Sequence, residues 1–375
     1  MRRAALLPLG GALASLAALA APFGADAEGL GFARLCLGGL AAACLWAGFA
    51  PGVGARPAGT AAVAALAALA GVAVVRMLSG GLENTAGPGF ALALVAVWLS
   101  AWHVVDAATA ARPRDPRLAS AANLVAPVVF GLTVLLLWEG VVRGFGSSMM
   151  KVILPAPSAI AARFGSSLPT LSADFAQTFQ GVSVGYALGC GSGILVAILI
   201  DRVPFLQRGL LPLGNLVSAL PIVGMAPIMV MWFGFDWQSK AAIVVIMTFF
   251  PQLVNTVAGL ASAGRMERDL MKTYAASYGQ TLAALRLPSA LPFIFNGLKI
   301  NSTLALIGAI VAEFFGTPIV GMGFRINTEV GRMNIDMVWA TILVSALTGS
   351  LFYGFLTLVE RRVTFWHASY RQRTT

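Results

Sequence analysis

The side chains that could take part in chemistry are few, and they lie at the edges of long apolar stretches. His103 and Asp106 stand three residues apart, on one face of a helix if this stretch is helical. Such a pair could pass a proton in an ion-coupled secondary transporter. It could also be a local pair without a role in transport, which is the interpretation that we favour.

Three more polar residues accompany the apolar stretch 293–315. Lys299 and Asn301 lie near its start, and Glu313 lies near its end. Placing a charge in or near hydrocarbon is costly, so each charged residue here is a candidate for a function. Glu313 could face a solute pathway or hold a partner subunit, but a carboxylate at a membrane surface can also simply meet water.

The sequence shows no motif for binding nucleotide phosphates or for catalysing hydrolysis. G-x-x-x-x-G-K-[ST], G-x-S-x-G and H-E-x-x-H are absent. Cys36, Cys44 and Cys190 form neither a C-x-x-C pair nor an even framework. We therefore expect no enzyme activity, metal or cofactor in this chain, and the energy for any transport must come from another subunit or from an ion gradient.

The composition of the chain indicates that membrane-spanning helices position these residues. With 58% hydrophobic and 11% charged residues, the chain is expected to be an all-α integral membrane protein. A segment of about 20 apolar residues, at about 1.5 Å per residue, crosses a hydrocarbon core of about 30 Å. Ten stretches meet this length: 4–23, 30–50, 60–78, 89–109, 122–141, 179–200, 212–234, 240–262, 293–315 and 337–359. The first could be a cleaved signal, but its length favours a retained helix.

A basic, proline-containing linker, ARPRDPRLAS, divides these stretches into four and six. We predict an N-terminal four-helix membrane region at 1–110, a cytoplasmic linker at 111–121, a transmembrane core at 122–362 and a cytoplasmic tail at 363–375. Of the 25 Lys and Arg residues, 17 fall on the side that holds both termini and the loop 265–292. That excess places this side in the cytoplasm, and it explains the net charge of +10 without nucleic acid.

Small residues and prolines punctuate the predicted core. Gly181, Gly185 and Gly189 share one helix face, a spacing that lets two membrane helices approach closely, and we expect a packing role. Pro221 and Pro227 interrupt the next stretch, and such prolines bend a spanning helix. The bend could line a solute pathway or serve packing alone. The candidate pathway residues are Pro221, Met225, Pro227, Met229, Asn301 and Glu313.

The segment 265–300 has the most mixed polarity in the chain. Between Glu267 and Arg286 apolar residues recur at three- and four-residue steps, which predicts an amphipathic helix outside the bilayer. Pro288 is expected to push Leu287 out of the helical region and to end this helix, so that a new one begins near Phe293.

This segment resembles the EAA loop of permease subunits of binding-protein-dependent ABC importers. The loop is written E-A-A, three residues, G, nine residues, I-x-L-P. Asp269, Leu270 and Met271 fall at E-A-A, Ala275 at the glycine, Leu285 at the isoleucine, and Leu287 with Pro288 at L-P. The following run, LPSALPFIFNGLKI, is similar to the branch of nitrate, taurine, alkanesulfonate and pyrimidine-precursor permeases.

The resemblance implies a six-helix type I importer core, preceded here by four extra helices, in a bacterial inner membrane. It implies a coupling helix that docks on a separate ATPase, with ATP and Mg²⁺ bound there, a periplasmic or lipid-anchored binding protein, and a second permease copy, with lipid around the pair. The binding protein would meet 143–177 and 316–336. The solute would be a pyrimidine or thiamine-precursor heterocycle, or a sulfonate, taurine or nitrate. The expected coupling residues are Asp269, Leu270, Met271, Tyr274, Ala275, Gly279, Leu285, Leu287 and Pro288.

An ion-coupled secondary transporter remains the alternative function. Such folds often show two similar halves. No convincing repeat relates residues 1–120 to the rest of the chain.

Overall fold

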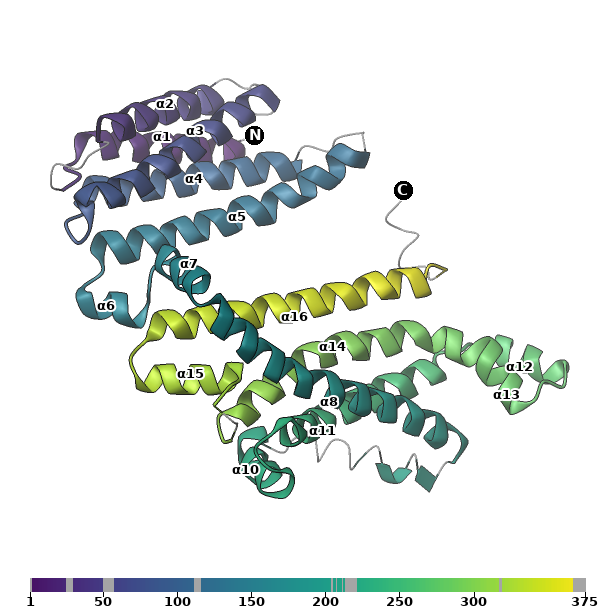
Figure 1. Ribbon diagram of the computed structural model, residues 1–375. Helices are drawn as coiled ribbons and strands as arrows, with labels where there is room; N and C mark the ends of the chain where they lie inside the picture. Colours follow the sequence, from purple (N-terminus) through teal and green to yellow (C-terminus); the bar gives the residue numbers. More distant parts are fainter. Residues whose placement is uncertain are drawn as a thin grey trace. The chain divides into compact units, whose positions relative to one another are not determined.

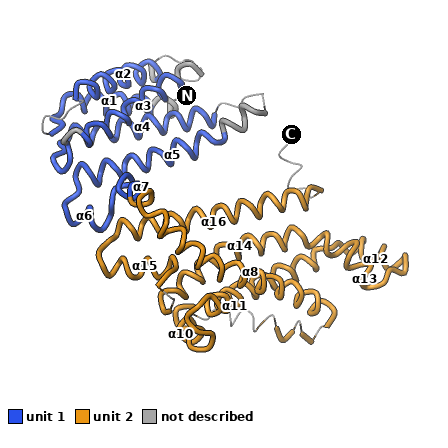
Figure 2. The backbone as a smooth tube through the Cα atoms, in the orientation of Figure 1, with its two compact units in different colours: residues 1–162 blue, residues 163–375 orange. Residues whose placement is uncertain are grey.

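A computed structural model describes residues 2–24, 30–49, 57–110, 116–203, 205–206, 208–210, 212, 221–316 and 319–366. Over these residues the regular secondary structure is helical. The chain divides into two compact units, Met1–Ala162 and Arg163–Thr375 (Figure 2). The predicted division at 111–121 stays a prediction.

Eight helices of the described chain are long and apolar enough to cross a membrane. They confirm the prediction of an all-α membrane protein. Two shorter apolar helices, Leu6–Ala20 and Ile222–Phe233, lie in the first and seventh predicted spans. Because 213–220 lies outside the described residues, the count of ten spans stays a prediction.

Unit 1 contains the N-terminal helices. They are α1 (Arg2–Ala20), α2 (Leu30–Phe49), α3 (Pro57–Met77) with a π-helical end at Leu78–Leu82, α4 (Pro88–Ala110), α5 (Pro116–Phe145) and α6 (Ser148–Ile153) (Figure 1). Its buried core is rich in alanine, which allows the helices to approach closely. The end of α1 meets the start of α4 through backbone hydrogen bonds from Gly87 N–H to Phe23 O (2.7 Å) and from Gly89 N–H to Pro22 O (2.9 Å).

Unit 2 contains the remaining spans. Its elements are α8 (Leu168–Arg202), α10 (Ile222–Phe233), α11 (Trp237–Ala261), α12 (Arg265–Thr273), α13 (Tyr278–Thr281), a π-helical segment (Leu282–Arg286), α14 (Leu287–Glu313), α15 (Met322–Gly331) and α16 (Ile335–Val363). The unit boundary falls within α7 (Pro157–Ser166). α8 starts well before the predicted span at 179, so much of the stretch 143–177 is helical.

The glycine face of α8 packs directly on α11. A Cβ added at Gly185 would lie 2.6 Å from the carbonyl oxygen of Ala241, and one at Gly193 would lie 2.8 Å from that of Phe249. Both distances are too short for real atoms, so only glycine permits this approach. The predicted packing role of these glycines is confirmed.

The prediction for the segment before α14 was wrong in two respects. The amphipathic helix does not run unbroken to Arg286 but is interrupted between Thr273 and Tyr278. Leu287 keeps helical angles (φ −64°, ψ −47°), and α14 begins there and not near Phe293. Pro288 stands in the first turn of α14, where proline is tolerated, and the π-helical segment Leu282–Arg286 directly precedes it, so the chain continues as a helix.

Candidate functional site

The segment 265–286 forms two arms at one end of unit 2, where α12 and α13 are labelled in Figure 1. The first arm, α12, has no buried residue. Leu270 is 55% exposed and the following Tyr274 is 77% exposed. Large apolar side chains left open on a polar helix are typical of a surface that binds another protein.

A helix-ending motif joins the two arms. Ala275 N–H donates to Lys272 O (2.9 Å) and Ala276 N–H to Met271 O (3.0 Å), the pair of bonds that defines a Schellman motif. Ala275 stands at its left-handed position with φ +53°. Glycine is the residue that usually occupies such a position, and the EAA pattern has its glycine here.

The second arm starts at a capping box and ends at a half-buried anchor. The Ser277 side chain accepts from Gln280 N–H, and the Gln280 side chain accepts from Ser277 N–H. Arg286 then reaches Asp201 at the end of α8 with two nitrogens, at 2.5 Å and 2.6 Å. Tyr278 donates its hydroxyl hydrogen to the same carboxylate at 3.0 Å.

The predicted coupling residues differ in exposure. Asp269, Leu270, Tyr274, Ala275 and Gly279 are exposed. The other four are half-buried: Met271 on α12, Leu285 in the π-helical segment, and Leu287 and Pro288 at the start of α14. Their docking role stays a prediction.

The predicted pathway residues do not form one cluster. Pro221 and Pro227 are exposed, Met225 is half-buried, and Met229 is buried against α11 and α14. Asn301 is fully buried and donates to the carbonyl oxygen of Thr248 at 2.9 Å. Whether any of them lines a route for solute stays a prediction.

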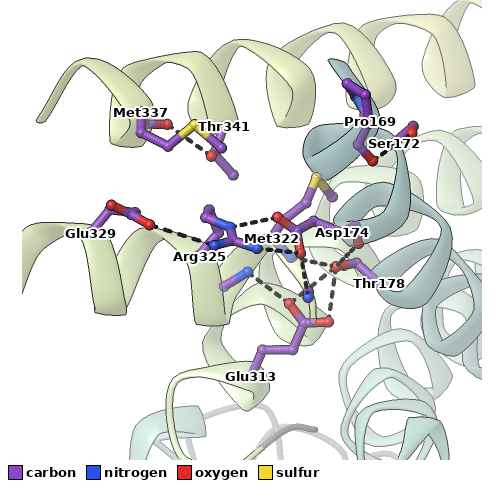
Figure 3. Close-up of polar contacts among 12 residues, drawn as sticks. Pro169, Ser172, Asp174, Thr178, Glu313, Met322, Arg325, Glu329, Met337 and Thr341 are labelled. Atoms are coloured by element: carbon purple, nitrogen blue, oxygen red, sulfur yellow. Dashed lines mark hydrogen bonds and ion pairs between the residues drawn. The ribbon is translucent and has the colours of Figure 1, made fainter. Parts of the chain in front are cut away.

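Glu313 belongs to a buried polar network at the other end of unit 2. Instead of meeting water, it is 2% exposed and accepts hydrogen bonds from the Thr178 hydroxyl (2.9 Å) and from Gly323 N–H (2.7 Å). Asp174, also buried, accepts from Gly321 N–H at 2.9 Å. Figure 3 shows both acids directed toward the start of α15, where they satisfy the backbone donors that a helix N-terminus leaves free.

A guanidinium completes this network. The Nε–H of Arg325 in α15 donates a hydrogen bond to Oδ2 of Asp174 at 2.8 Å, and Nη1 of Arg325 lies 3.5 Å from Oε1 of Glu329. These bonds, with Asp174 the larger contributor, raise the pKa of Arg325 above its usual value despite burial. The network therefore ties α8, α14 and α15 together with charge-assisted bonds.

Sequence reasoning missed the residues that form the anchors at both ends. Asp201, Asp174, Thr178 and Arg325 were not candidates, and Arg286 entered only as one of the basic residues. Asp201 and Arg286 are 85 residues apart, and Asp174 and Arg325 are 151 apart. A charge at the end of an apolar span was the available signal. In unit 1, His103 is buried and Asp106 exposed, and Nε2 of His103 has no hydrogen-bond partner in the described structure.

Comparison with known proteins decides the family. Residues 189–365, within unit 2, match the family described as binding-protein-dependent transport system inner membrane component. The chain is 32% identical, over 64% of its own length and 95% of the relative's, to the formylaminopyrimidine transport permease protein ThiX of Halalkalibacterium halodurans. The chain belongs to this permease family.

Other relatives of the permease are named for the transport of different solutes. It is 26% identical to the putative aliphatic sulfonates transport permease protein SsuC of Bacillus subtilis, over 69% of this chain and 92% of the relative. It is 29% identical to the taurine transport system permease protein TauC of Escherichia coli, over 52% and 66%. Because the chain belongs to this family, it is an ABC importer permease and not an ion-coupled secondary transporter. Permeases of this family work with ATPase and substrate-binding partners.

Proposed function

We propose that this permease imports a pyrimidine-type heterocycle and that residues 265–288 dock on its separate ATPase. The observation that carries the docking proposal is the exposed arm α12, which ends in a left-handed Ala275 at the glycine position of the EAA pattern. The apolar side chains of Leu270 and Tyr274 would enter a groove of the ATPase. The relative with 95% coverage, named for formylaminopyrimidine, supports the solute class.

The remaining partners follow the same scheme. Two copies of the chain would pair in the membrane, and ATP with Mg²⁺ would bind only to the ATPase subunits, so this chain would be no enzyme itself. The 17 of 25 basic residues on one side favour cytoplasmic termini and a cytoplasmic docking segment. A periplasmic or lipid-anchored binding protein would then meet the opposite end, near α15.

The docking proposal is tested by purifying the permease in mild detergent from its native membrane. A vanadate-sensitive ATPase should co-purify with the wild type and be lost when Asp269, Tyr274 and Ala275 are replaced by arginine. The single variant Tyr274→Arg leaves the left-handed Ala275 unchanged, and it should weaken co-purification of the ATPase. Val330→Arg, at an exposed apolar residue of α15, is the matched control and should retain the ATPase. A wild type that purifies with no ATPase would overturn the proposal.

The solute class is tested on the binding protein that stimulates ATP hydrolysis by the reconstituted complex. Formylaminopyrimidine should raise the melting temperature of that binding protein, and taurine, an alkanesulfonate and nitrate should not. If taurine, the alkanesulfonate or nitrate stabilises the binding protein and formylaminopyrimidine does not, the solute class proposed here is wrong.

A further inference from the structure

The two arms of the docking segment differ in how they are attached. In the described structure, the side-chain hydrogen bonds of α12 stay within 264–273, as in the exposed pair of Lys272 and Asp269 at 3.0 Å. The second arm is bonded to the transmembrane bundle. A force applied to α12 can therefore reach the bundle along the backbone, through 262–264 into α11, or through the side-chain bonds of 278–286.

The backbone of this arm continues into α14, and Arg286 makes most of its side-chain attachment to the other helices. Besides its two bonds to Asp201, it donates from Nε (3.1 Å) and Nη2 (3.0 Å) to the carbonyl oxygen of Leu260. Asp201 lies in the last turn of α8 and Leu260 in the last turn of α11, so one guanidinium holds both helix ends. The two charged side chains are only 14% and 15% exposed, which shields their attraction from solvent.

Tyr278 strengthens the same joint from the other end of the arm. Its hydroxyl bonds Asp201, and the guanidinium of Arg202 lies 5.4 Å from its ring centroid. The arm is thus fixed at both of its ends to the last residues of α8. α8 and α11 in turn pack closely along the glycine face of α8, so they should move as one body.

We infer that Arg286 is a positioning residue for ATP-driven transport: its fork to Asp201 and Leu260 carries the displacement of the docked segment into α8 and α11. This inference rests on the proposed docking of the ATPase. A lysine at 286 keeps the charge but has no planar fork, and it cannot bond Asp201 twice and Leu260 at the same time.

The test follows movement directly and needs no solute. Spin labels are placed at Leu199 of α8 and Leu351 of α16, both exposed, and labelled permease is diluted with unlabelled permease. The distance between labels is measured in the complex with its ATPase, before and after trapping with Mg-ATP and vanadate. The wild type should show a shift in distance that Arg286→Lys and Asp201→Asn reduce to about a tenth. Because Asp201 lies on α8, outside the docking segment, Asp201→Asn should leave ATPase co-purification and basal ATP hydrolysis unchanged.

A second ion pair provides the matched control. Lys299 of α14 and Glu360 of α16 form a pair of similar burial at 2.8 Å, away from the docking segment. Glu360→Gln should keep the wild-type shift. If Arg286 only stabilised the fold, Arg286→Lys would lower the melting temperature, and the rate of ATP hydrolysis and the distance shift would fall together.

The outcomes separate the two proposals. If no ATPase co-purifies with the wild type, the docking proposal fails and this inference fails with it. If the ATPase co-purifies and Arg286→Lys retains the full shift, or the wild type shows no shift, the inference alone is overturned.

Discussion

The hydroxyl oxygen of Thr178 lies 2.9 Å from Oε1 of Glu313, although 135 residues separate them in the chain. The same oxygen accepts the N–H of Met322 at 2.9 Å. One threonine of α8 thereby joins the end of α14 to the first turn of α15. The two carboxylates near it cap α15 from other helices, so this short helix is held by the ends of two spans.

Removing this hydroxyl should destabilise the fold. Thr178→Val keeps the shape but leaves a buried carboxylate and a backbone N–H each with one partner fewer, which costs about 1–3 kcal/mol. The free energy of unfolding in detergent micelles measures the effect. Thr178→Ser retains the hydroxyl and should stay within about 1 kcal/mol of the wild type. Equal stability of the valine and serine variants would contradict this role.

Breaking the ion pair beside it should cost more. Arg325→Gln leaves Asp174, which is 0% exposed, without its cation, and loss of one partner of a buried pair costs about 3–5 kcal/mol. Because the folded pKa of Arg325 is raised, its contribution is present below its ordinary pKa and is lost only at more alkaline pH. The Arg325 contribution should therefore be constant between about pH 6 and 9.

A double variant checks that assignment. Asp174→Asn together with Arg325→Gln removes both charges and should recover part of the lost melting temperature. If the double variant is as unstable as the sum of both single variants, the two residues act independently, which would contradict the pairing.

The left-handed residue in the docking segment predicts a stabilising substitution. Ala275 holds φ +53°, which costs a non-glycine residue about 1 kcal/mol. Ala275→Gly removes this strain and should raise the free energy of unfolding by a similar amount. Ala276→Gly, next to it and outside the left-handed region, should be neutral or slightly destabilising. An Ala275→Gly variant less stable than the wild type would show that chain entropy outweighs the strain.

Several features were predictable because they depend on local pattern. Apolar length predicted the spans, and the spacing of Gly181, Gly185 and Gly189 predicted the packing face of α8. The spacing from Asp269 to Pro288 assigned Ala275 to the glycine position of the EAA pattern, but the turn that the structure shows there was not predicted. The anchors were not predictable, since a charge such as Asp201 gives no sign of a partner 85 residues away. The continuation of helix through Pro288 also escaped prediction, because a proline that ends one helix and a proline in the first turn of the next give the same sequence signal.

The contact between α8 and α11 gives the last prediction. A Cβ at Gly185 would lie 2.6 Å from both the Ala241 carbonyl oxygen and the Val244 Cβ, so Gly185→Leu must push the two helices apart. Such overpacking costs about 1–3 kcal/mol or more. The melting temperature and the monodisperse fraction in detergent should both fall. Gly191→Leu is the matched control, because nothing lies within 4 Å of a Cβ built there, and it should behave like the wild type. If both leucine variants are equally stable, the two helices do not depend on the glycine face for their packing.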